Sequence, residues 1–154
     1  MLDSSPNREF AMKSSLSALG LLLSIAATGG ADAASLTVDI GNRLKPGETL
    51  MVAVYDDANS WLKKPLRAIR EAAPAAVGAS GRHQLTLEGL PPGRYALSVY
   101  VDRNGNGKLD RGMFGIPSEP YGFSQGGGSM GPPDFSDAAV ELTEADATIP
   151  IKLR

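Results

Sequence analysis

Oxygen-bearing side chains recur at alternate positions between Asp102 and Asp110, in the run Asp-Arg-Asn-Gly-Asn-Gly-Lys-Leu-Asp. Hard cations such as Ca²⁺ bind several oxygen ligands, and EF-hand-type loops supply them from positions one, three, five, seven and nine, with glycine at position six. The corresponding ligands here are Asp102, Asn104, Asn106, the backbone carbonyl of Lys108, and Asp110, and Gly107 holds position six. The spacing therefore predicts a calcium-type metal site.

The end of this loop departs from the calcium-binding pattern, because Met113 stands where a bidentate glutamate is expected. Glu119 or Asp134 from the following segment, or water, could supply the missing oxygens. A turn without a metal is the alternative, since asparagine and glycine both accommodate left-handed backbone. Asp56 and Asp57 are left out of the site. If successive strands run strictly up and down, these two residues lie at the opposite end of the sandwich. A bound cation would order the long segment that follows the loop.

A two-residue alternation of apolar and polar side chains predicts the strands that position this loop. The strand from Tyr95 to Val101 is rich in β-forming residues, follows a proline-glycine turn, and delivers Asp102 at its end. Comparable runs occupy residues 36–40, 50–54, 84–88, 138–142 and 147–153. Together with a strand over residues 65–77, these runs predict an all-β sandwich of seven short strands, whose loops gather at its two ends.

The assignment of residues 65–77 has two interpretations. Leu66, Ile69 and Ala72 recur at a helical period, whereas the prolines at both ends and the β-rich surroundings favour a strand. We predict the strand.

Between Asp110 and Asp137 no periodicity remains, and a segment of this length inside a compact domain is usually functional or disordered. Its aromatic residues argue against disorder, and they form either a contact surface for a partner or a small core that fixes the loop. Both interpretations stay open for the set Phe114, Tyr121, Phe123 and Phe135. The triple glycine at 126–128 lacks the lysine of a phosphate-binding loop, so nucleotide binding is not supported.

Residues 1–33 have the order of a secretory signal peptide. Lys13 precedes an apolar run over residues 16–27, and small residues follow up to a cleavage point expected between Ala33 and Ala34. The apolar run is too short to span a bilayer as a helix, and translation could begin at Met1 or Met12. We therefore expect a periplasmic or secreted protein, with residues 34–154 as a single β-sandwich domain and no membrane span after cleavage.

Composition argues against several classes of function. The chain carries 15 basic and 17 acidic residues, a net charge of −2, which provides no field to attract nucleic acid or an anionic membrane. His83 is the only histidine and cysteine is absent, so a histidine-based metal site and a catalytic triad are both unsupported, and His83 is expected on a strand surface. We expect a protein that is not an enzyme, with structural Ca²⁺ as its one cofactor.

Four motifs occur in order along the chain: Leu-Pro-Pro-Gly-Arg-Tyr at 90–95, the loop at 102–110, Tyr-Gly-Phe-Ser at 121–124, and Gly-Pro-Pro-x-Phe at 131–135. In this combination the chain resembles an uncharacterised family of exported bacterial proteins over nearly all of residues 35–154. More distantly it is similar to prealbumin-like sandwiches, such as carboxypeptidase regulatory-like and collagen-adhesin B-type domains. The resemblance implies a seven-stranded antiparallel prealbumin- or immunoglobulin-like β-sandwich with a long ordered loop and an accessory or binding role. It implies no catalytic residue.

Two functions therefore remain as hypotheses. The first is a non-catalytic binding module of the cell envelope, which contacts an unknown protein or glycan through the aromatic loop surface. The second is a hydrolase of an extracellular polymer that uses carboxylates in the long loop. An exposed apolar patch would favour the first, and two carboxyl groups at catalytic separation in a cleft would favour the second.

Overall fold

The apolar alternation is realised as eight strands in the computed structural model, which describes residues 34–41, 44–73, 81–127 and 130–154. The strands are β1 (Ala34–Ile40), β2 (Thr49–Tyr55), β3 (Arg67–Ala72), β4 (His83–Leu90), β5 (Gly93–Asp102), β6 (Tyr121–Phe123), β7 (Val140–Leu142) and β8 (Ala147–Ile151). A 3-10 turn, η1 (Met113–Gly115), and a short helix, α1 (Phe135–Ala138), lie between β5 and β7. The predicted signal peptide over residues 1–33 lies outside the described residues.

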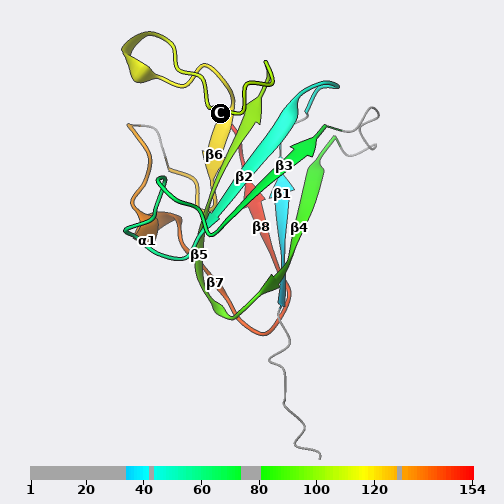
Figure 1. The fold of residues 1–154 in the computed structure, drawn as a ribbon. Coiled ribbons are helices and arrows are strands. Elements are labelled where there is room, and N and C mark those ends of the chain that lie inside the picture. The colour runs from blue at the N-terminus through cyan, green and yellow to red at the C-terminus, as the bar shows by residue number, and fades with distance from the viewer. Residues whose placement is uncertain (1–33, 42–43, 74–80, 128–129) are drawn as a thin grey trace, which may run out of the picture.

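The strands form two sheets, as Figure 1 shows. One sheet has the order β4-β1-β8, and the other has the order β3-β2-β5-β6, with β7 paired to the first residues of β5. Every pair is antiparallel except β1 with β8, which run parallel. The all-β sandwich prediction is confirmed, with eight strands in place of seven. The additional strand β6 spans three residues, which is too few for alternation to reveal.

The residues between positions 65 and 77 contain a strand, as predicted. In β3, Ile69 pairs with Val52 of β2 and packs against the core, while alternate residues of the strand are exposed. The helical interpretation is wrong because pairing with β2 satisfies the backbone of this segment. The edge of β3 approaches β4, where Glu71 lies 3.2 Å from Nε2 of His83. His83 is therefore a strand residue, as expected. Its side chain is mostly buried between β4 and the edge of β3, whereas a position on the strand surface was expected.

The main core lies between the two sheets and consists of the inward-facing residues of each strand. Leu36, Val38 and Ile40 from β1 and Leu97 and Val99 from β5 are almost completely buried. Because side chains alternate across a strand, the intervening residues form the outer face of each sheet. The outer face of the five-stranded sheet carries the candidate site.

A second, aromatic cluster packs on that outer face, beside the main core. Trp61 is its centre, with Tyr55 at a ring-centroid distance of 4.9 Å and Phe123 at 5.9 Å. The indole Nε1 of Trp61 donates a hydrogen bond of 2.8 Å to the carbonyl oxygen of Pro133. Trp61 thus packs under the segment that carries Pro133. Among the described residues, no helix has the length and apolar character needed to cross a bilayer.

Candidate functional site

Asp102 stands at the end of β5, where the strand leaves the sheet and the predicted metal loop begins. Its side chain is completely buried and accepts three backbone hydrogen bonds. Oδ1 accepts from the backbone N of Gly105 at 2.7 Å and of Asn106 at 3.2 Å, and Oδ2 accepts from the N of Gly107 at 2.7 Å. The carboxylate therefore closes the turn by binding the amides of its own loop.

The charge of Asp102 follows from these contacts. Burial raises the pKa of its carboxyl group, whereas the hydrogen bonds from Gly107, Gly105 and Asn106 lower it. The hydrogen bonds outweigh the burial, and the pKa lies below its ordinary value. Asp102 is thus held as a buried anion whose charge is spread over three amide donors.

The remaining side chains of the loop converge on Asp110. Its Oδ2 lies 2.5 Å from Nδ2 of Asn104, and its Oδ1 lies 2.9 Å from Nδ2 of Asn106. The Oδ1 atoms of the two asparagines accept the backbone N–H groups of Asn106 and Lys108, at 3.1 and 2.8 Å. The structure thus brings four predicted ligand side chains together, each with partners inside the protein. Binding of Ca²⁺ stays a prediction, because these hydrogen bonds also suit a turn without a metal.

Glu119 has a different role from the one expected. It is only 6% exposed, Oε1 accepts from the backbone N of Arg103 at 2.7 Å, and Oε2 accepts from the N of Asp110 at 3.0 Å. Both oxygens are therefore engaged with the two ends of the loop, and Glu119 clamps the loop closed. No spacing rule in the sequence points to this contact, because it depends on where the chain folds back.

Asp134 is too remote to supply the missing oxygens, and this expectation is wrong. It lines a separate hollow of about 650 Å³ together with Asp56 and Asp57. In the register of β2 with β5, Thr49 pairs with Asp102 whereas Tyr55 pairs with Ala96. Asp56 follows Tyr55 directly, so this hollow lies at the opposite end of the sheet from the loop. The placement of Asp56 and Asp57 away from the loop is confirmed.

Of the three aspartates in this hollow, only Asp134 belongs to the long loop whose carboxylates the hydrolase hypothesis invokes. Oδ2 of Asp57, however, accepts the backbone N–H groups of Asn59 and Ser60, at 2.9 and 3.0 Å, and so fixes the turn that leads to Trp61. Within the described part of the chain, no group of three or more histidine, cysteine or acidic residues is arranged to hold a metal. Asp57 therefore has a structural role in this hollow.

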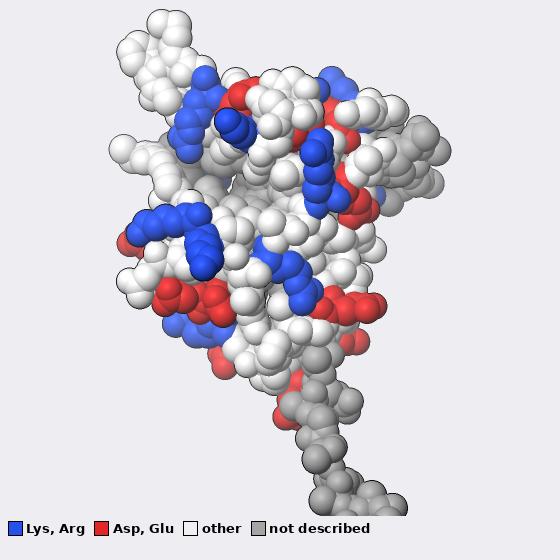
Figure 2. Space-filling view, viewed as in Figure 1, with Lys and Arg blue, Asp and Glu red and all other residues white. Residues whose placement is uncertain are grey.

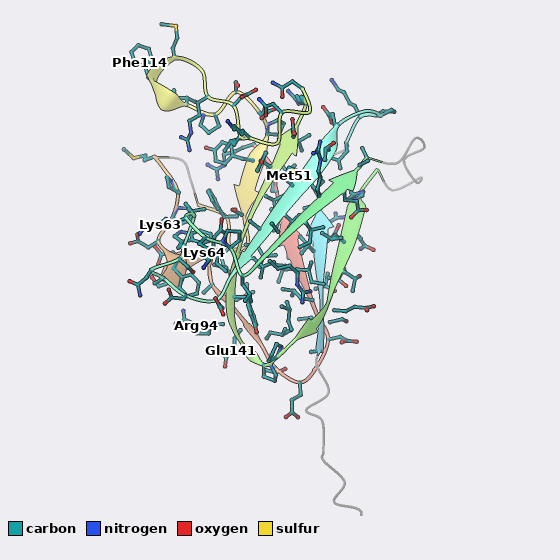
Figure 3. All side chains as sticks on the ribbon, viewed as in Figure 1. Met51, Lys63, Lys64, Arg94, Phe114 and Glu141 are labelled. Atoms are coloured by element: carbon teal, nitrogen blue, oxygen red, sulfur yellow. The ribbon has the colours of Figure 1, made fainter. Side chains whose placement is uncertain are left out.

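After Asp110 the chain forms a narrow hairpin that projects from the sandwich. Arg111 bridges to Pro117, and the backbone N of Gly112 donates a 2.8 Å hydrogen bond to the carbonyl oxygen of Ile116. The guanidinium Nη1 of Arg111 donates a hydrogen bond of 3.0 Å to the carbonyl oxygen of Gly115. At the tip, Phe114 has a left-handed φ of 62° and a side chain that is 93% exposed (Figure 3). An ordered hairpin thus holds a large apolar side chain in solvent.

The four aromatic residues predicted as a contact surface differ in their packing and exposure. Phe135 packs edge-on against Trp61 at 6.2 Å, and buried Phe123 joins the same cluster. Tyr121 is half-buried, with its ring 6.0 Å from that of Phe123, and Phe114 is exposed. The small-core interpretation therefore describes Phe123, Phe135 and the half-buried Tyr121, while Phe114 is exposed to solvent.

A groove of about 580 Å³ separates the hairpin from the outer face of the five-stranded sheet. Apolar and aromatic residues dominate its lining, among them Leu62, Tyr100, Phe114, Ile116, Tyr121 and Met130. Ile116 is 65% exposed and Met130 is fully exposed, although no sequence pattern singles out either residue. Figure 2 shows the hollow on this face of the molecule. The aromatic residues between Asp110 and Asp137 indicated this part of the chain in the sequence. The aliphatic residues of the same segment complete the apolar lining of the groove.

The fold and the groove define a β-sandwich protein with an apolar loop-bordered surface. A family model described as uncharacterised proteins conserved in bacteria matches residues 38–150, and the chain belongs to this family. No curated protein matches the chain. Among solved structures, a pilus-presented adhesin, Spy0125 (Cpa), is similar at 14% identity and a TM-score of 0.28, over 79% of this chain and 27% of that one. A likeness at this score carries no argument about function.

Proposed function

We propose that the protein is a non-catalytic binding module of the bacterial envelope, and that the groove beside the hairpin is its contact surface. The observation that carries the proposal is the gathering of large exposed apolar side chains around one groove. Leu62, Phe114, Ile116 and Met130 line it and are all exposed. Contiguous exposed apolar surface is costly in water and commonly marks an interaction site.

The rigidity of the hairpin supports the same proposal. Arg111, Gly112 and Ser118 each make a hydrogen bond that ties one side of the hairpin to the other or to its tip. An L-residue at positive φ is strained, yet the surrounding bonds hold Phe114 in this conformation. A hairpin backbone that is ordered before binding loses less entropy when a partner docks, which favours affinity.

The envelope location and the calcium role belong to the proposal as well. The signal-peptide pattern of residues 1–33 supports export, and the family is bacterial. The loop from Asp102 to Asp110 leads directly into the hairpin, so Ca²⁺ bound there would stiffen the base of the contact surface. In this proposal the cation is structural and takes no part in chemistry.

Competition for envelope binding tests the proposal. We expect labelled full-length protein to be retained saturably by envelope fractions from cells that lack it, and unlabelled wild-type protein to displace it. The double variant Phe114→Ser/Ile116→Ser should fail to displace the label. Leu66→Ser is the matched control, since Leu66 is exposed but does not line the groove, and it should compete like wild type. Equal competition by the double variant would refute the groove as contact surface.

A further inference from the structure

The floor of the groove combines small and large side chains. On the outer face of the sheet, Ser98 of β5 pairs with Phe123 of β6, and Tyr100 pairs with Tyr121. All four residues line the groove, and Ser98 is much smaller than the three aromatic residues. Because cross-strand neighbours stand close together, this difference in size leaves a shallow trough at Ser98.

The walls of the trough are built from different parts of the chain. The hairpin contributes Phe114, Ile116 and Pro117 on one side, and Leu62 and the segment 130–132 also line the groove. Tyr55 and Ser98, which both carry a hydroxyl group, are also among the lining residues. A volume of about 580 Å³ is within the range of ligand grooves, and a few polar groups among apolar ones are their usual chemistry.

The charged lining of the groove is basic. Arg111 is part of the lining, which contains no aspartate or glutamate, and Lys63 and Lys64 directly follow Leu62. Across the described residues, no ion pair involves Arg111, Lys63 or Lys64. Figure 2 shows basic side chains above and below the hollow, and Figure 3 places both lysines on the segment below the hairpin. The groove is therefore locally cationic in a chain whose net charge is −2.

We infer that the groove binds an extended peptide segment of a partner protein, in which large apolar side chains stand next to acidic residues. The apolar side chains would fill the trough, the hydroxyl groups would bind the peptide backbone, and the acidic residues would meet Arg111 and the two lysines. Arg111 uses one N–H for Gly115, and a guanidinium has five, so it can bind a carboxylate while it supports the hairpin. The inference rests on the proposed function and adds the chemistry of the ligand.

A set of three blocked synthetic peptides tests the inference by titration calorimetry with the full chain. The first has leucine and phenylalanine at its centre and aspartate at both ends, the second has lysine in place of aspartate, and the third has serine in place of the apolar residues. We expect the first to bind, the second to bind roughly three- to tenfold more weakly, as solvent-exposed charge pairs allow, and the third not to bind. High salt should reduce the difference between the first two peptides.

Substitutions locate the interaction. Arg111→Gln should weaken binding of the acidic peptide about three- to tenfold, and Arg111→Lys should retain most of it. Because Arg111 also supports the hairpin, the double variant Lys63→Gln/Lys64→Gln provides a second test that leaves the hairpin intact, and it should weaken the same peptide. Lys152→Gln removes an exposed charge elsewhere and should change nothing.

Several results would overturn the inference and each has a separate meaning. Equal affinity for the aspartate and lysine peptides removes the charge preference, and equal affinity for the serine peptide removes the apolar trough. Failure of all three peptides, or binding instead to vesicles of phosphatidylcholine and phosphatidylglycerol or to chito-oligosaccharides, contradicts a peptide ligand. In each of these cases the proposed function still stands if Phe114→Ser/Ile116→Ser fails to compete for the envelope. It falls if that variant competes like wild type.

Discussion

Buried polar residues decide the local conformation at several points, and Asp102 is the clearest of them. A carboxylate without exposure to water is unfavourable unless donors surround it, and the three amides of its loop provide them. The sequence spacing that predicts a metal site also describes this self-contained turn. Spacing alone cannot separate the two, because both need oxygen atoms directed into the same loop.

The lowered pKa of Asp102 predicts how its contribution depends on pH. A carboxyl group whose pKa is lower in the folded state stabilises the fold above its unfolded pKa of about 3.9, and this stabilisation is lost as the pH falls through the folded value. Asp102→Asn should therefore lower the unfolding midpoint clearly at pH 7 and much less in strong acid. Thermal unfolding across this pH range tests the prediction. Asp137→Asn on exposed α1 is the control, and a difference between wild type and Asp102→Asn that does not vary with pH would contradict it.

Gly122 in β6 shows a constraint of another kind, because it lies against the C-terminal segment of the chain. A Cβ atom at this position would stand 2.7 Å from the carbonyl oxygen of Lys152 and 3.0 Å from Cγ2 of Ile151. We expect Gly122→Ala to destabilise the protein by about 1–3 kcal/mol through overpacking. Chemical denaturation measures the change. Gly41→Ala is the control, because its Cβ would have only one neighbour, at 3.9 Å, and similar stability losses in the two variants would oppose this account.

At the scale of elements, the sequence predicts the strands better than the site. Alternation over five to seven residues identifies β1, β2, β4 and β5, whereas β6 is too short to show it. At the predicted metal loop, the side chains of Asn104 and Asn106 do contact Asp110, while binding of a metal there stays a prediction. The groove was not predictable in full, since Ile116 and Met130 lie on separate segments of the chain that line one surface only after folding. The role of Glu119 depends on the same long-range contact.

The clamp by Glu119 predicts the behaviour of the whole loop and hairpin. Glu119→Ala removes the acceptor for the part-buried backbone N–H groups of Arg103 and Asp110, and each hydrogen bond lost costs about 0.5–1.5 kcal/mol. We expect lower stability and faster amide hydrogen exchange over residues 103–118. Exchange measured by mass spectrometry tests this prediction. Glu141→Ala, on the exposed face of β7, should leave exchange in this segment unchanged, and an equal effect of both variants would exclude the clamp.

At the scale of the whole molecule, calcium binding would appear as an increase in the free energy of unfolding. A ligand that binds only the folded state stabilises it by about 2.7 kcal/mol at one hundred times its Kd. We expect millimolar Ca²⁺ to raise the unfolding midpoint of the chelator-treated protein by several degrees, and Asp110→Asn to reduce this shift. If neither Ca²⁺ nor Mg²⁺ moves the midpoint, the loop is a turn held by its own hydrogen bonds. The proposed contact surface does not depend on that outcome.

The whole molecule presents two different faces, and this difference leads to the most direct test of the binding proposal. One outer face carries the apolar groove, and the other carries exposed threonines such as Thr86 and Thr148. We would introduce a photoreactive benzoyl-phenylalanine at Phe114 or, as control, at Thr148, and irradiate cells that produce each full-length protein. A binding module of the proposed kind gives one dominant adduct from position 114, which excess wild-type protein suppresses, and none from position 148. Absence of an adduct at position 114, or the same adducts from both faces, would contradict a contact surface at the groove.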